Sequence, residues 1–158
     1  MKLRKQWMVR IVAGLLLVVL AGGIAYVIRD LLAMRNPESA LPVIDIEYNG
    51  KPLPPQHYMM DSYSWRFLFS AKEWEEPDRS VVDRLEPAPV LPGAPLDISF
   101  SFPYKTITVS RSYGNRNHYE EITGELQTPF TGGVYTYKVE AEWGARGSVL
   151  YYIKIRVG

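Results

Sequence analysis

The chain lacks cysteine altogether and has only two histidines among its 158 residues. The absence of cysteine excludes disulfide bonds, thiolate metal ligands, a cysteine nucleophile and the lipidated cysteine of a lipoprotein. A zinc site needs three or four converging ligands, and neither His57 nor His118 stands in such a pattern. We therefore expect both histidines on surface loops, and we predict no metal and no cofactor.

Sequence motifs for catalysis are also missing. The chain has no G-x-S-x-G elbow, and Gly132-Gly133 precedes a predicted strand rather than the helix that a phosphate-binding loop requires. The acidic residues between Glu73 and Asp78 are interrupted by Pro77 and do not have EF-hand spacing, so we interpret them as a solvated loop. No pair of carboxylates stands out for glycoside hydrolysis. The sequence predicts a protein that is not an enzyme, with a hydrolase of unrecognised site as the least favoured alternative.

One long apolar run is present, from Ile11 to Ile28, and it contains no charged residue. As a helix this run is about 27 Å long, close to the hydrocarbon thickness of a bilayer. Trp7 and Tyr26 lie near its two ends, as interfacial aromatic residues do. Residues 11–28 are thus predicted to form a transmembrane helix in contact with the lipid bilayer.

The charges on the two sides of this run predict its orientation. Residues 1–10 carry four basic residues and no acidic one, whereas the other flank is mixed. The positive-inside rule places residues 1–10 in the cytoplasm as a basic tail and the C-terminal part outside, at the cell membrane. The alternative is a signal peptide cleaved near Ala21-Gly22-Gly23. The run continues to Ile28, beyond a typical signal-peptide core, so we favour an uncleaved anchor.

From Arg29 onward the chain has 14 basic and 17 acidic residues, a net charge of −3. A mildly acidic domain is a poor candidate for nucleic-acid binding, and we predict none. Residues 29–42 form a short stalk punctuated by prolines, and residues 43–158 form one extracytoplasmic domain.

This domain is predicted to be all-β. Alternating apolar and polar residues predict strands in the ranges listed here: Val43–Tyr48, Ser62–Ser70, Leu96–Phe102, Lys105–Tyr113, part of Glu120–Phe130, Val134–Trp143 and Val149–Val157. Asn49-Gly50 predicts a tight turn. Val81–Leu85 is assigned to a short edge strand, and Ala71–Ser80 to a polar loop or one helical turn. The four prolines of Pro87–Pro95 argue against a place inside a sheet.

The C-terminal hairpin shows the clearest alternation. Tyr135, Tyr137 and Val139 alternate with Thr136, Lys138 and Glu140, and residues 144–147 (GARG) form the turn. The second arm places Ile153 on the core face, and it places Tyr152, Lys154 and Arg156 on the opposite, solvent-exposed face. About seven such strands predict an immunoglobulin-like antiparallel β-sandwich behind one N-terminal transmembrane α-helix, with a small β-barrel as the alternative.

Several of these segments also carry a resemblance. They are Ser62-Tyr63-Ser64-Trp65, Pro92-Gly93 leading into Leu96–Phe100, Gly133–Tyr137 and Ala141-Glu142-Trp143 followed by Tyr151–Val157. Over residues 43–157 the chain resembles small membrane-anchored or secreted proteins of Bacillus-like Gram-positive bacteria, whose function is unknown. That group often has cysteine where this chain has Ser64. The resemblance implies a fold and a compartment, and no catalytic residue.

One polar and aromatic loop is the candidate binding site. It is RSYGNRNHY, and its candidate residues are Arg111, Tyr113, Asn115, Arg116, His118 and Tyr119. Loops of this composition on rigid sandwiches are frequent recognition sites. Trp74 lies in a polar segment and is a candidate exposed aromatic residue. We expect a domain that binds an envelope protein, and the alternative is a module that binds cell-wall glycan or peptide.

Overall fold

The computed structural model describes residues 2–77, 81–114 and 118–158, and it divides the chain into two compact units. The first unit contains the chain up to Ala40 together with Phe67–Phe69. The second unit contains Leu41–Arg66 and Ser70–Gly158. Each unit is described by itself.

The first unit is dominated by helix α1 (Lys2–Arg35). Its part from Arg10 to Arg35 is apolar and long enough to cross a membrane, with none of it buried against protein. A helix with an apolar surface on every side suggests a membrane anchor or a signal sequence. The helix continues beyond Ile28 and is followed by the 3₁₀ turn η1 (Pro37–Ala40), so most of the predicted stalk is helical.

The second unit consists mainly of two sheets, as the sequence predicts. The small sheet has the order β2-β1-β6, formed by β1 (Ile44–Tyr48), β2 (Lys51–Pro52) and β6 (Leu96–Phe100), all antiparallel. The turn between β1 and β2 is the predicted one. Asn49 and Gly50 both have positive φ, 51° and 71°, which is the conformation of a type I′ hairpin turn.

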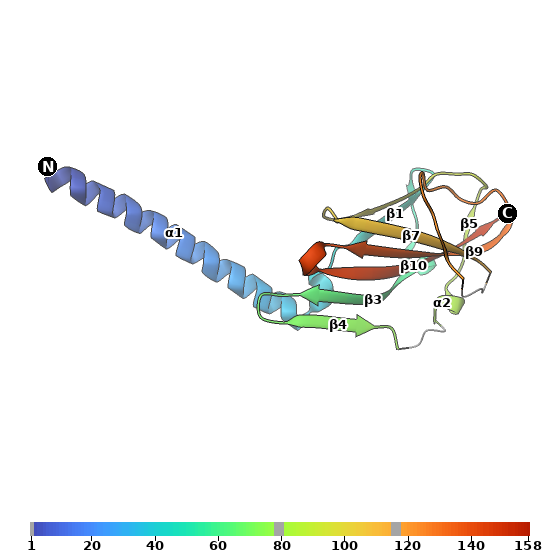
Figure 1. Cartoon of the computed structure of the whole chain (residues 1–158), viewed down its shortest axis with the longest axis horizontal. Helices are drawn as coiled ribbons and strands as arrows, with labels where there is room; N and C mark the ends of the chain where they lie inside the picture. Colours follow the sequence, from blue (N-terminus) through green and yellow to red (C-terminus); the bar gives the residue numbers. More distant parts are fainter. Residues whose placement is uncertain (1, 78–80, 115–117) are drawn as a thin grey trace. The chain divides into compact units, whose positions relative to one another are not determined.

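The large sheet has the order β4-β3-β10-β9-β7-β8. Figure 1 labels its strands β4, β3, β10, β9 and β7. Its strands are β3 (Tyr58–Arg66), β4 (Ala71–Glu75), β7 (Thr106–Tyr113), β8 (Glu120–Glu121), β9 (Gly133–Glu142) and β10 (Gly147–Val157). A further strand, β5 (Ala88–Val90), pairs with the end of β10 in parallel. The described part of the unit also contains three short helical turns: η2 (Pro55–His57), α2 (Val81–Arg84) and η3 (Gly144–Arg146).

The long hairpin β9–β10 confirms the strongest sequence pattern. Its register pairs Val139 with Tyr151 and Tyr137 with Ile153, and all four side chains are buried. Residues of both sheets share this core: Phe100 of β6 lies 5.2 Å from Trp143 between ring centroids. Trp65 of β3 is also buried and lies 5.7 Å from Trp143. The two sheets are therefore joined by an aromatic cluster at this end of the core.

Three local predictions were wrong. Ala71–Glu75 is strand β4 rather than a loop or a helical turn, and Val81–Arg84 is the helical turn α2 rather than an edge strand. Ala88–Val90 does enter a sheet despite its proline, although only as a short strand beside the last residues of β10. In addition, the strand predicted to reach Ser70 ends at Arg66 as β3, and Phe69 beyond it is exposed.

Two polar residues expected in water are buried. His57 is not on a surface loop: its side chain is 6% exposed, and Nδ1 lies 2.8 Å from the carbonyl oxygen of Glu86. A carbonyl oxygen only accepts, so Nδ1 carries the proton. The sequence predicts Lys154 on the solvent-exposed face of the sheet, but the residue is only 7% exposed. Its ammonium group donates hydrogen bonds to the carbonyl oxygens of Asp83 and Val82. The segment around α2 therefore covers one end of the outer face of the large sheet.

Candidate functional site

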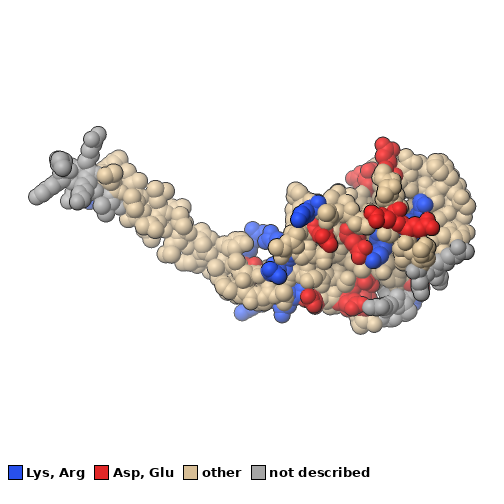
Figure 2. All heavy atoms as spheres, in the orientation of Figure 1, with Lys and Arg blue, Asp and Glu red and all other residues tan. Residues whose placement is uncertain are grey.

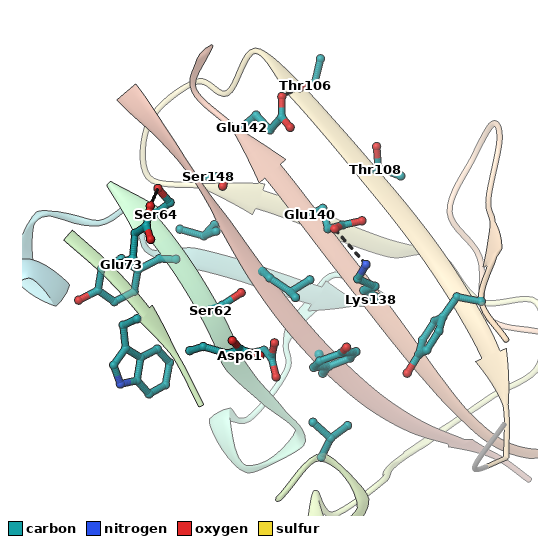
Figure 3. Close-up of a pocket in the computed structure, with 18 of the residues that line it drawn as sticks. Asp61, Ser62, Ser64, Glu73, Thr106, Thr108, Lys138, Glu140, Glu142 and Ser148 are labelled. Atoms are coloured by element: carbon teal, nitrogen blue, oxygen red, sulfur yellow. Dashed lines mark hydrogen bonds and ion pairs between the residues drawn. The ribbon is translucent and has the colours of Figure 1, made fainter. Parts of the chain in front are cut away.

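A hollow of about 1270 Å³ lies on the outer face of the large sheet (Figure 3). Its lining comes from β4, β3, β10, β9 and β7, and α2 contributes at one side. The labelled side chains in Figure 3 stand on this face of the sheet, and they include Ser62 and Ser64 of β3, Glu140 of β9 and Thr108 of β7. Strands far apart in the sequence thus supply one continuous polar surface.

Strand alternation explains why polar residues gather here. On β9 the inward residues Tyr137 and Val139 are completely buried, and the residues that alternate with them point to the opposite face. These outward residues are Lys138, Glu140 and Glu142, and all three line the hollow. The same period places Thr106 and Thr108 of β7, and Ser148 and Tyr152 of β10, on this face.

A β-bulge adds a further carboxylate. The pairing of β3 with β10 matches Ser62 with Leu150 and Met60 with Tyr151, so Asp61 is the extra residue. A bulge reorients the residue that has no partner across the strands. Asp61 lines the hollow, and its carbonyl oxygen accepts a hydrogen bond from the Glu76 N–H at 2.7 Å.

The hollow is strongly acidic. Its described lining has six carboxylates and one ammonium group, a formal charge of −5; these charged residues are Asp61, Glu73, Glu75, Asp83, Glu140, Glu142 and Lys138. On the face drawn in Figure 2, acidic side chains are spread widely over the second unit. Like charges around a concave surface reinforce one another's potential and attract groups of opposite charge.

The polar groups of the hollow pair along the strands instead of converging on one point. Lys138 Nζ lies 2.9 Å from Glu140 Oε1. The Thr106 hydroxyl donates to Glu142 at 3.2 Å, and the Ser64 hydroxyl donates to Glu73 at 3.4 Å. Among the described residues, no group of three or more histidine, aspartate or glutamate side chains is arranged to hold a metal ion. The arrangement suits an extended contact surface better than a single reacting centre.

Two tyrosines lie at the end of the hollow near α2. The rings of Tyr119 and Tyr152 are 6.1 Å apart, and both line the hollow. Burial, with smaller contributions from Tyr152, Asp83 and Asp61, raises the pKa of Tyr119 to about 12. The Tyr119 hydroxyl is therefore a proton donor at neutral pH, and it offers a hydrogen bond that the carboxylates do not.

The candidate binding loop is divided by the structure. Arg111 and Tyr113 belong to β7 on the inward side of the sheet, where both lie against the ring of Tyr135, at 5.7 Å and 5.1 Å. His118 is exposed, and Tyr119 lines the hollow. Asn115 and Arg116 lie outside the described residues. The structure thus brings Tyr119, and not Arg111 or Tyr113, to the acidic face.

Trp74 is half-buried rather than fully exposed. It is paired with Tyr63 in the register of β3 and β4, and the two rings stack 6.0 Å apart with an interplanar angle of 22°. By alternation, Glu73 and Glu75 point to the opposite side of β4 from Trp74. Trp74 is among the residues that line the hollow, but its ring stacks on Tyr63 and points away from the carboxylates.

Sequence reasoning missed the hollow as a site. The one sequence signal for the hollow is the polar face of residues 136–142, and this pattern alone does not distinguish a binding surface from ordinary solvent-exposed surface. Comparison of the chain with protein-family models, with curated proteins and with solved structures finds no match. The resemblance to proteins of Bacillus-like bacteria stays a prediction.

Proposed function

We propose that the chain is a single-pass membrane protein that holds its β domain outside the cytoplasm, where the acidic hollow of the large sheet binds a basic segment of a partner protein. The apolar helix α1 supports the anchor, and the basic residues before it support this orientation. Two antiparallel sheets with a buried Trp65 support an immunoglobulin-like arrangement of the domain.

The observation that carries the proposal is the charge of the hollow. The concave surface is built by five neighbouring strands, and its described lining carries six carboxylates but one ammonium group. A partner with several lysine or arginine side chains would exchange hydration for charge-assisted hydrogen bonds to these carboxylates. Such complementarity raises the association rate and disfavours acidic competitors. Binding should weaken with added salt, because rim charges are screened within about 8 Å at physiological ionic strength.

A binding role fits this surface better than catalysis. Catalytic acids and bases must converge within hydrogen-bond reach of one reacting atom. Here Glu140 is held by Lys138, and Glu142 accepts from Thr106, so these two carboxylates are engaged along β9 and β7. The surface presents several partly engaged acceptors over a wide area, as protein interfaces do.

A glycan-binding role is the second candidate. The observation that favours it is the pair of tyrosine rings, Tyr119 and Tyr152, beside hydroxyl and carboxylate groups in the hollow. The acidic charge favours the protein partner, because a neutral sugar can donate hydrogen bonds to carboxylates but gains no charge attraction from an excess of them. Retention on purified peptidoglycan that is unaffected by salt would support the glycan role instead.

Site-directed crosslinking tests the proposal, since the chain has no native cysteine. A thiol-reactive photocrosslinker is attached to a single introduced cysteine. Ser148→Cys places the crosslinker in the hollow, and Ser99→Cys places it at an exposed position of the small sheet. In native membranes we expect one discrete protein adduct from position 148 and none from position 99. Equal adducts from both positions, or no adduct from position 148, would contradict the proposal.

A charge series adds the chemical control. Glu140→Gln with Glu142→Gln should abolish the adduct from position 148, because it removes two of the six negative charges of the hollow. Glu47→Gln with Asp97→Asn removes two exposed carboxylates from the small sheet and should leave the adduct unchanged. The proposal is wrong if both double variants lose the adduct to the same extent.

A further inference from the structure

The tip of the β3–β4 hairpin is apolar, unlike most hairpin loops. It consists of Phe67, Leu68 and Phe69, between the end of β3 at Arg66 and the start of β4 at Ala71. Phe67 is buried, but Leu68 is 47% exposed and Phe69 is 69% exposed. Hairpin loops normally carry glycine, asparagine, aspartate or proline in water. Two adjacent large apolar side chains at a loop tip therefore indicate contact with a partner or a membrane.

This tip belongs to the same compact unit as helix α1. The carboxylate of Asp30 accepts a hydrogen bond from the backbone N–H of Leu68 at 2.7 Å. Asp30 lies two residues after Ile28, the last residue of the uncharged run. Two residues of α-helix span about 3 Å, so this hydrogen bond holds Leu68 close to the depth at which α1 leaves the hydrocarbon.

Basic residues flank the apolar tip. Arg66 precedes it, Lys72 follows it, and both side chains are exposed. Arg29 lies next to Asp30 on the helix and is also exposed. Apolar side chains bordered by lysine and arginine match the interface of a bilayer, where the apolar groups enter the acyl boundary and the cations meet phosphate groups.

We propose that Leu68 and Phe69 insert into the headgroup region of the same bilayer that α1 crosses. The inference rests on the membrane anchor of the proposed function. The tip forms a second, shallow attachment beside the helix, and the Asp30–Leu68 hydrogen bond sets its depth. Two attachments restrict the motion of the hairpin at the membrane more than one helix alone does.

Spin labels at single introduced cysteines test this in the full chain. The chain is reconstituted into vesicles of phosphatidylcholine and phosphatidylglycerol, with labels on Phe69→Cys, Leu20→Cys or Phe130→Cys. Phe130 is the matched control, because it is an 80% exposed phenylalanine of the second unit. Accessibility to oxygen, which concentrates in lipid, is compared with accessibility to a water-soluble nickel complex.

We expect the label at position 20 to be accessible to oxygen and the label at position 130 to be accessible to the nickel complex. The label at position 69 should be several-fold less accessible to the nickel complex than the label at position 130. Adding Asp30→Ala should raise nickel access at position 69, because the backbone loses its acceptor. Equal nickel access at 69 and 130, with position 20 in lipid, would overturn this inference alone. Nickel access at position 20 would overturn the membrane anchor itself.

Discussion

The ammonium group of Lys154 donates to the carbonyl oxygen of Asp83 at 2.6 Å, joining the longest strand of the large sheet to the helical turn α2. A buried cation is costly unless hydrogen bonds satisfy it. Here the carbonyls of Asp83 and Val82 both serve that role, at the end of the sheet where Asp83 borders the hollow. A side chain from β10 therefore positions one wall of the candidate site.

Lys154→Met should destabilise the full chain in detergent micelles by about 1–3 kcal/mol, because it removes the ammonium donor from the carbonyl oxygens of Asp83 and Val82. Denaturant unfolding followed by tryptophan fluorescence measures this loss. Arg156→Met is the control at the next outward position of β10, which is exposed, and should change stability by about 0.5 kcal/mol or less. Equal losses in the two variants would show that the Lys154 contact is not stabilising.

Gly147→Ala should be strongly destabilising. Gly147 has φ of 141°, and a Cβ atom there would collide with the carbonyl oxygen of Ser64 on the neighbouring strand. Strain and displaced backbone together should cost about 2–4 kcal/mol in the same unfolding measurement. Gly132→Ala is the control, because its Cβ would lie 3.6 Å from the Val157 carbonyl oxygen, an ordinary contact. A tolerated alanine at position 147 would contradict the close approach of β3 and β10.

Tyr137→Asp should abolish the native fold. The side chain of Tyr137 is completely buried, and aspartate there would place a carboxylate in the core while leaving the space of the ring unfilled. Loss of the near-ultraviolet circular dichroism signal is the expected result. Tyr137→Phe keeps the ring and should keep the signal. A native spectrum for the aspartate variant would show that this face of β9 is not the core.

Tyr119 should make stability fall at high pH. Its pKa is about 12 in the folded chain, against about 10 for an unperturbed tyrosine. Between these values the unfolded chain releases the proton while the folded chain keeps it, so stability is lost as the pH rises through this range. Tyr119→Phe should reduce the loss between about pH 10 and pH 12. Denaturation midpoints with the same pH dependence in both proteins would contradict the burial of this hydroxyl.

The sequence predicted those elements whose pattern is local. The apolar run gave α1, the Asn49-Gly50 pair gave the β1–β2 turn, and strict alternation gave the β9–β10 hairpin. Strand β4 was missed because its charged residues line the hollow while Trp74 alone packs back on Tyr63. The helical turn at Val81–Arg84 was missed because its two valines favour a strand by intrinsic propensity.

The site itself depends on how the strands pair and in which register. A local sequence pattern does not specify either of these. Glu73 and Glu140 are far apart in the sequence and line one hollow because β3 and β10 lie between their strands. The bulge at Asp61 is a feature of pairing, and nothing in the sequence around it marks an extra residue. The burial of His57 and Lys154 likewise comes from contacts with Glu86 and Asp83, on segments distant in the chain.

The most direct test of the account is the sidedness of the chain in intact cells. A membrane-impermeant maleimide is applied to variants with one cysteine, Ser99→Cys in the β domain or Lys5→Cys in the basic tail. We predict that Ser99→Cys is labelled in intact cells, that Lys5→Cys is labelled only after permeabilisation, and that both proteins stay with the membrane fraction. Labelling of Lys5→Cys alone in intact cells, or recovery of the full chain in the soluble fraction, would contradict the anchored, outward-facing domain.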